Sequence, residues 1–220
     1  MISARRLVGA TAIVLLLAAC GGGSDGGSTD GGDTPGPAPH AGVQVVATGA
    51  WNDIGLGSGS WGWGVLLENP GAEAIRVDMD VNALNSAGEV VDSMTAMWTV
   101  VVAGSQGGIS GGFFGVPEGE QVSEIEIASI ETSPSEFGSS TLAVGGVTVA
   151  DSVVTGSVAN GSDQALAGVW VTGLQVQSGS VVGGGGTMID VPSGGATDFT
   201  VNLIGSLTGD LIVVAAPPYN

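Results

Sequence analysis

Hydrophobic and polar residues alternate along several stretches of this chain, most clearly in IRVDMDVNAL at residues 75–84. The first, third, fifth and seventh positions are apolar, whereas the positions between them carry arginine, aspartate or asparagine. The stretch VSEIEIAS at residues 122–129 repeats this two-residue period. Side chains that alternate in this way point to opposite faces of a strand, so both stretches are predicted to be β-strands with one buried face.

Turn-forming sequences such as NPG, NSAG and PEG separate these stretches, and no segment after residue 41 shows a sustained helical period of apolar residues. The first half of this region contains seven short strand candidates, at residues 43–49, 60–68, 75–84, 88–93, 96–102, 109–114 and 122–129. Their number and spacing predict an all-β fold of the immunoglobulin-like sandwich type.

The second half of the chain repeats the pattern of the first. ENPGAEAIRVDMDVNALNSAGEVV aligns without a gap with ANGSDQALAGVWVTGLQVQSGSVV, so that Asn69 falls on Asn160 and Gly88 on Gly179, 91 residues apart in both cases. A constant offset indicates two copies of one module. The alternative is a chance likeness between strands that are both rich in glycine and valine.

The repeat predicts two tandem immunoglobulin-like antiparallel β-sandwiches. We place the first domain at residues 42–136 and the second at residues 137–220. The alternation slips in the second copy at Gly168, after which Val169 and Val171 take the inward positions. A β-bulge is therefore expected at Gly168, because one extra residue shifts the phase of a strand.

The amino-terminal stretch has the order of an export signal. A run of thirteen largely apolar residues from Leu7 to Ala19 follows two arginines, and it is too short to span a bilayer, which takes about 20. The run ends in LAAC, which resembles the lipobox of bacterial lipoproteins, where the signal is cut directly before the cysteine. That resemblance implies a signal peptide at residues 1–19 and acyl chains such as palmitate on Cys20. The alternative is an ordinary signal peptide followed by a chance cysteine.

Residues 21–41, GGGSDGGSTDGGDTPGPAPHA, consist almost entirely of small or polar residues and proline. Such a composition offers little apolar surface to bury, so it predicts a solvated tether. With Cys20 it forms a segment, residues 20–41, that we expect to hold the folded part beside a membrane through covalent lipid. The expected location is the cell membrane or the outer membrane, facing the periplasm or the exterior.

The module also resembles the FxLYD-type domains of bacterial surface lipoproteins, in which an asparagine-containing turn leads to a long strand, a glycine turn and a pair of valines. The aromatic positions that give this family its name are replaced here by VNALN. The resemblance implies extracellular interaction or structural support without enzymatic activity. The matching positions are Asn69, Asn85, Gly88, Val90 and Val91 in the first copy, and Gly156, Asn160, Gly179, Val181 and Val182 in the second.

The charge of the chain argues against nucleic acid as a partner. The formal net charge is −18, there is no lysine, and Arg76 is the one arginine outside the signal segment. Binding to a phosphate backbone depends on lysine and arginine side chains that displace counterions. The expected partners are therefore the membrane, through the lipid, and an envelope protein or polysaccharide that the sequence does not identify.

Residue types that usually perform catalysis or bind transition metals are scarce. The region after residue 41 contains no histidine, cysteine or lysine, so the common general bases, thiol nucleophiles and zinc ligands are missing. Asp78, Asp80, Glu124 and Glu126 are predicted to share a sheet face, which makes calcium an alternative, but rows of charge usually face water. We predict no enzyme, no catalytic residue, no metal and no cofactor.

Tryptophans are the remaining candidates for a binding site. Trp61 and Trp63 are two residues apart and therefore lie on the same face of a predicted strand, among glycines. Exposed, they would form an apolar platform for a carbohydrate or a protein partner. The favoured interpretation places them in the core, as it does Trp98 and Trp170, because aromatic side chains dominate the buried area of sandwiches.

Overall fold

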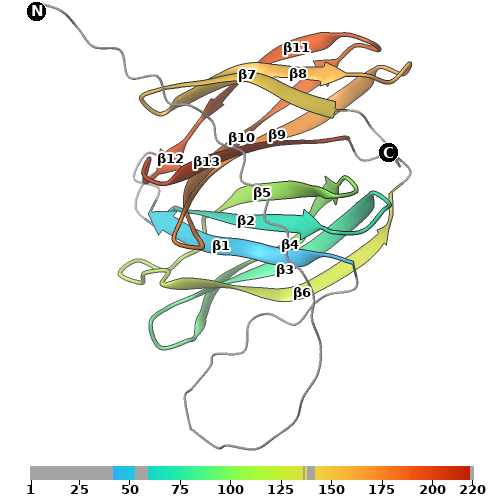
Figure 1. The fold of residues 1–220 in the computed structure, drawn as a ribbon. Helices are drawn as coiled ribbons and strands as arrows, with labels where there is room; N and C mark the ends of the chain where they lie inside the picture. Colours follow the sequence, from blue (N-terminus) through green and yellow to red (C-terminus); the bar gives the residue numbers. More distant parts are fainter. Residues whose placement is uncertain (1–41, 53–58, 136, 138–141, 219–220) are drawn as a thin grey trace, which may run out of the picture. The chain divides into compact units, whose positions relative to one another are not determined.

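The computed structural model describes residues 42–52, 59–135, 137 and 142–218 (Figure 1). The predicted signal peptide at residues 1–19, the lipid attachment at Cys20 and the tether at residues 21–41 lie outside the described residues. Within the described ranges every regular element is a strand, so the prediction of an all-β fold is confirmed. The described part also contains no helix of the length and hydropathy needed to cross a membrane.

The first half of the chain forms one β-sandwich of six strands. Three of them pair in the order β1-β2-β5 and the other three in the order β4-β3-β6, with antiparallel neighbours throughout. The apolar side chains that alternate along β2 and β3 meet between these two layers and form the first core, with Trp63, Val77 and Phe113 at its centre. The strands are β1 (Gln44–Asn52), β2 (Trp61–Asn69), β3 (Ile75–Leu84), β4 (Val90–Val101), β5 (Ser105–Phe113) and β6 (Glu124–Pro134).

The second half forms a second sandwich with the same strand order. Its layers are β7-β8-β11 and β10-β9-β13, which correspond one by one to β1-β2-β5 and β4-β3-β6, and the short strand β12 pairs with β10. The two halves of the chain therefore share one strand order, which is the arrangement that two copies of one module would give. The strands are β7 (Leu142–Ala150), β8 (Val153–Asn160), β9 (Leu166–Gln177), β10 (Ser180–Val191), β11 (Ala196–Asn202), β12 (Ile204–Gly205) and β13 (Asp210–Ala216).

The first sandwich has six strands where the sequence predicts seven. The candidates at residues 88–93 and 96–102 are one continuous strand, β4, because both halves of it pair with β3. A bulge joins them: Met79 pairs with Met97 and Val81 with Met94, so two steps along β3 match three along β4. Ala96 absorbs the extra residue with a left-handed φ of 55°. The extra residue interrupts the alternation, so one strand has the sequence pattern of two.

The bulge predicted at Gly168 is present. Ile189 pairs with Val169 and Val191 with Leu166, so three steps along β9 match two along β10. Gly168 has a φ of 76°, a conformation that costs glycine little and other residues more. The core residues after it therefore shift by one position, as the sequence suggested.

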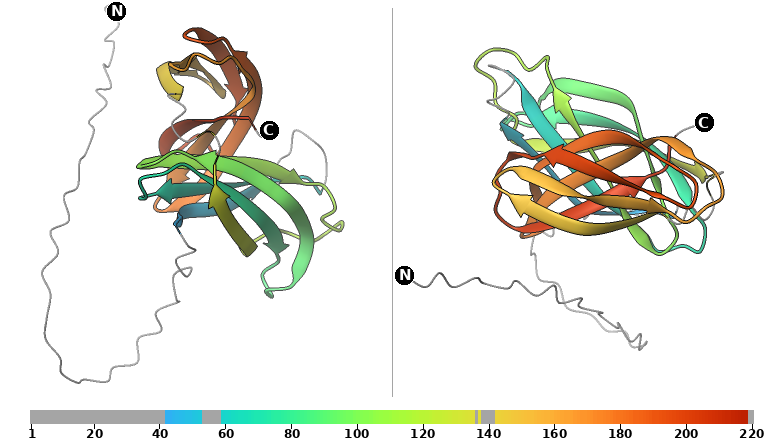
Figure 2. Two further views of the ribbon diagram at one scale, coloured as in Figure 1. Left: turned by 90° about the vertical axis from the view of Figure 1, so that its right-hand side faces the viewer. Right: turned by 90° about the horizontal axis from the view of Figure 1, so that it is seen from above.

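The two sandwiches pack on each other through their middle layers (Figures 1 and 2). A third apolar cluster joins β1 and β2 of the first sandwich to β9 and β10 of the second, and the two sandwiches belong to one compact unit. One parallel bridge, between Thr48 and Ser180, also links β1 to β10. The buried members of this central cluster are Ala47, Trp51, Leu66, Leu174 and Val181.

Glycines allow these middle layers to approach closely. The indole ring of Trp51 lies against Gly62. A side chain at position 62 would collide with this ring. A Cβ atom on Gly64 would lie 2.9 Å from Leu174 across the interface. The Nε1 atom of Trp51 is buried with no hydrogen-bond partner among the described residues, so close packing positions this ring.

Candidate functional site

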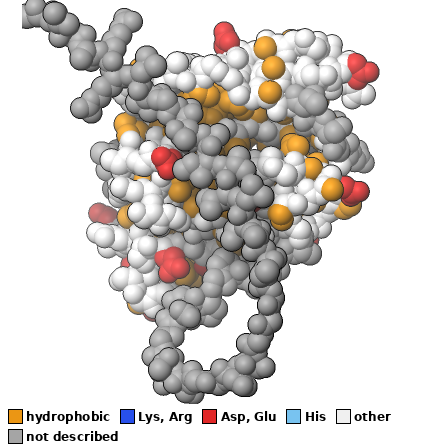
Figure 3. Space-filling view, in the orientation of Figure 1, with side chains coloured by type: hydrophobic (Ala, Val, Ile, Leu, Met, Phe, Trp, Pro, Cys, Tyr) orange, Lys and Arg blue, Asp and Glu red, His pale blue; other side chains and the backbone are white. Residues whose placement is uncertain are grey.

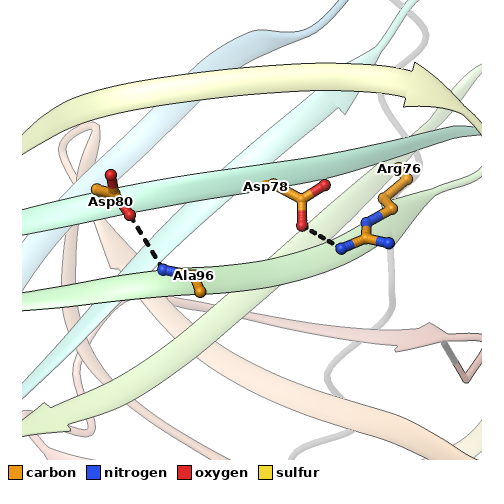
Figure 4. Close-up of polar contacts among 4 residues, drawn as sticks. All are labelled: Arg76, Asp78, Asp80 and Ala96. Atoms are coloured by element: carbon orange, nitrogen blue, oxygen red, sulfur yellow. Dashed lines mark hydrogen bonds and ion pairs between the residues drawn. The ribbon is translucent and has the colours of Figure 1, made fainter.

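The acidic face predicted on the first sandwich is a network of polar contacts. Arg76 and Asp78 form an ion pair along β3, and Asp80 accepts a hydrogen bond of 3.0 Å from the backbone N–H of Ala96 (Figure 4). Glu126, on β6, accepts a bond of 3.1 Å from the Asn82 amide. Within the described ranges, no three acidic, histidine or cysteine side chains are grouped so that they could hold a metal ion.

Trp61 and Trp63, the predicted ligand-binding candidates, belong to the first core. Trp63 has an exposed fraction of 0% and packs against Phe113, with 6.0 Å between the ring centroids. Trp61 is half-buried and packs against the same core. Because the ring of Trp63 has no accessible surface, these two residues form no platform, and their burial supports the core interpretation.

Trp98 and Trp170 are more accessible than the sequence suggests. Both are half-buried, and they line a cavity of about 280 Å³ that β4 and β5 of the first sandwich form with β9, β10 and β13 of the second. Met97 and Met188 complete its apolar walls, and Met188 is 62% exposed. Two aromatic rings and two flexible thioethers make a surface that adapts to apolar groups.

A second cavity of about 250 Å³ adjoins the first, since Ser110 and Trp170 line both. Its floor is largely glycine, from β5 and β10, and its rim carries Phe114 and Ile204, which are 67% and 37% exposed. We call the two cavities together the apolar groove. The residues that define it are Met97, Trp98, Ser110, Phe114, Trp170 and Met188.

The two β-bulges meet at this groove. Ala96, on the bulge of β4, and Gly168, on the bulge of β9, both line the first cavity. Each donates its backbone N–H to an aspartate on the facing strand: Ala96 to Asp80 at 3.0 Å and Gly168 to Asp190 at 2.8 Å. The bond from Gly168 holds the Asp190 carboxylate next to the cavity, whereas Asp80 lies on the outer face of β3, where it also accepts a hydrogen bond from Ser129 of β6.

A second aspartate is bound next to Phe114, which lines the second cavity. Asp92 accepts a hydrogen bond of 2.8 Å from the backbone N–H of Gly115, the residue after Phe114. The charged side chains visible on the face drawn in Figure 3 are likewise acidic. The apolar groove therefore combines an aromatic and thioether lining with negative charge at its edges.

Phe114 and Met188 are not among the candidates predicted from the sequence. The signal for Phe114 is the pair Phe113-Phe114, because consecutive residues of a strand point to opposite faces and only one of them can enter the core. Met188 stands near the end of a run of glycines in β10 with no such signal. Phe114 and Met188 come together because the two sandwiches pack on each other. The sequence pattern of one module does not reveal that packing.

Comparisons with known proteins do not assign the chain to a group. No family model matches the sequence, and no curated protein matches it either.

Proposed function

We propose that this chain is a lipid-anchored protein of the bacterial cell envelope that works as a non-enzymatic binding module, with the apolar groove as its binding surface. The observation that carries the binding role is the exposure of Phe114 and Met188 beside cavities lined by Trp98 and Trp170. Large exposed apolar side chains that gather around a concave surface are typical of interaction sites.

The anchoring part of the proposal is supported by the sequence LAAC and by the tether composition at residues 21–41. More than one acyl chain holds a protein stably at a bilayer, whereas one chain binds only marginally. The intact mass of protein from a bacterial membrane fraction tests this point. Lipid on Cys20 is expected, and Cys20→Ser should release the chain; an unmodified Cys20 would overturn the anchoring.

Photo-crosslinking in intact envelopes tests the binding role. Benzoylphenylalanine replaces Phe114 in the groove or, as a matched control, Val149 on β7, which is 50% exposed. We expect adducts with an envelope component from position 114 and none of the same mass from position 149. Equal labelling from both positions, or none from position 114, would contradict a binding role for the groove.

A further inference from the structure

We infer that the apolar groove takes a polypeptide segment with two neighbouring hydrophobic side chains flanked by lysine or arginine. This inference rests on the proposed binding function and names the chemistry of the partner. It follows from the division of the groove into two joined cavities, from the position of two aspartates, and from the charge of the whole chain.

The shape of the groove favours a chain with two apolar side chains over one compact group. Its cavities have similar volumes, about 280 and 250 Å³, and are joined at Ser110 and Trp170. Trp98 and Met188 line the first, and Phe114 stands at the second. One large side chain in each cavity places the connecting backbone over the shared residues, Ser110 and Trp170.

The charges at the groove favour a cationic partner. Asp190 accepts a backbone hydrogen bond from Gly168, which lines the first cavity, and Asp92 accepts one from Gly115, the neighbour of Phe114 at the second cavity. Arg76 forms an ion pair with Asp78, and the chain contains no lysine. Complementary charge speeds association and rejects partners of the same sign. Anionic polymers are therefore disfavoured at this surface.

The aromatic lining adds to this preference. Trp98 and Trp170 line the first cavity, and indole rings carry a negative quadrupole face that attracts ammonium and guanidinium groups. The Asp190 carboxylate is held in position by the backbone N–H of Gly168 at the bulge of β9, so its location does not depend on a partner. A basic side chain that leaves the apolar cavity therefore meets a carboxylate already in place.

The test uses the full chain carrying Cys20→Ser and three fluorescein-labelled peptides, measured by fluorescence anisotropy. The probe is Lys-Leu-Lys-Phe-Lys-Leu, and the controls are Glu-Leu-Glu-Phe-Glu-Leu and Lys-Ser-Lys-Ser-Lys-Ser. We expect the probe to bind at least about tenfold more tightly than either control, and its affinity to fall as the salt concentration rises. No binding of the probe, or equal binding of a control peptide, would overturn the inference.

Variants locate the binding. Phe114→Ser and Met188→Ser should each weaken binding of the probe peptide at least about fivefold. Val149→Ser changes an exposed residue outside the groove and should leave the affinity unchanged. Asp190→Asn should weaken binding of the probe about threefold and reduce the salt dependence of that binding. The control Asp198→Asn changes an exposed aspartate of β11 and should do neither. Circular dichroism checks that each variant is folded. If the groove variants bind the probe as tightly as the chain without these substitutions, the groove is not the binding site.

Neutral oligosaccharide provides the opposing outcome. If cellohexaose binds in the groove and the probe peptide does not, the partner is a carbohydrate and the inference fails. The proposed function would survive that result, since crosslinks from position 114 would then identify a polysaccharide. Absence of crosslinks at that position would instead contradict the proposed function itself.

Discussion

Asn69 and Asn160 make the same hydrogen bonds at the same place in the two sandwiches. Each is 1% exposed. Each amide donates to the carbonyl four residues ahead and to the carbonyl 32 residues ahead, and each side-chain oxygen accepts from the backbone N–H two residues ahead. The asparagine thus ties its own turn to the end of a distant strand in both copies, which explains why it is repeated.

Asn69→Ala and Asn160→Ala should each lower the free energy of unfolding by about 2–4 kcal/mol. Each change leaves two carbonyl groups without their amide donor, and unpaired buried groups are costly. Urea denaturation measures the effect, with Asn202→Ala, an exposed residue of β11, as a control expected within about 0.5 kcal/mol. If one of the two buried asparagines is dispensable, the two turns are not equivalent.

Gly62→Ala should lower the free energy of unfolding by about 1–3 kcal/mol, because the added methyl group enters the space filled by the Trp51 indole. Gly145→Ala is the matched control, since a Cβ there has open space around it. The control is expected to change stability by less than about 0.5 kcal/mol. Equal urea midpoints for the two variants would show that Trp51 can move aside without cost.

The central cluster should make the two sandwiches unfold together. In a calorimeter we expect one transition for the full chain and two for Leu174→Asp, because an unpaired carboxylate between the middle layers opens them while each sandwich keeps its own core. Val154→Ala removes packing from the second core alone. It should lower the transition temperature without splitting the transition. A single transition in Leu174→Asp would contradict this coupling.

The sequence predicted individual strands better than their assembly. The alternation at residues 75–84 coincides with β3, because strict period two needs only local information. Trp63 and Trp170 look alike in the sequence, both being tryptophans beside glycine or valine in apolar strands. Trp63 is buried within its own module, whereas Trp170 is placed at a groove by the other module. That difference depends on sheet packing over long sequence distances, which periodicity does not encode.

The polar surface of β3 marks a difference between the two copies. Where the first copy has Asp78 and Asp80 on the outer face of β3, the second has Trp170 and Thr172 on the corresponding face of β9. The apolar version faces the other sandwich and the charged version faces solvent. Identical strand order therefore does not imply identical surfaces.

The packing of the two modules joins unlike faces: the β1-β2-β5 layer of one meets the β10-β9-β13 layer of the other, which corresponds to β4-β3-β6. A head-to-tail contact of this kind has no closing symmetry and can in principle be extended without limit. At one end the outer face of β3 is charged and carries the ion pair of Arg76 and Asp78, which opposes stacking there, much as the polar outer faces of terminal repeats do in solenoid proteins. A further module could pack at that end only if its charged face became apolar.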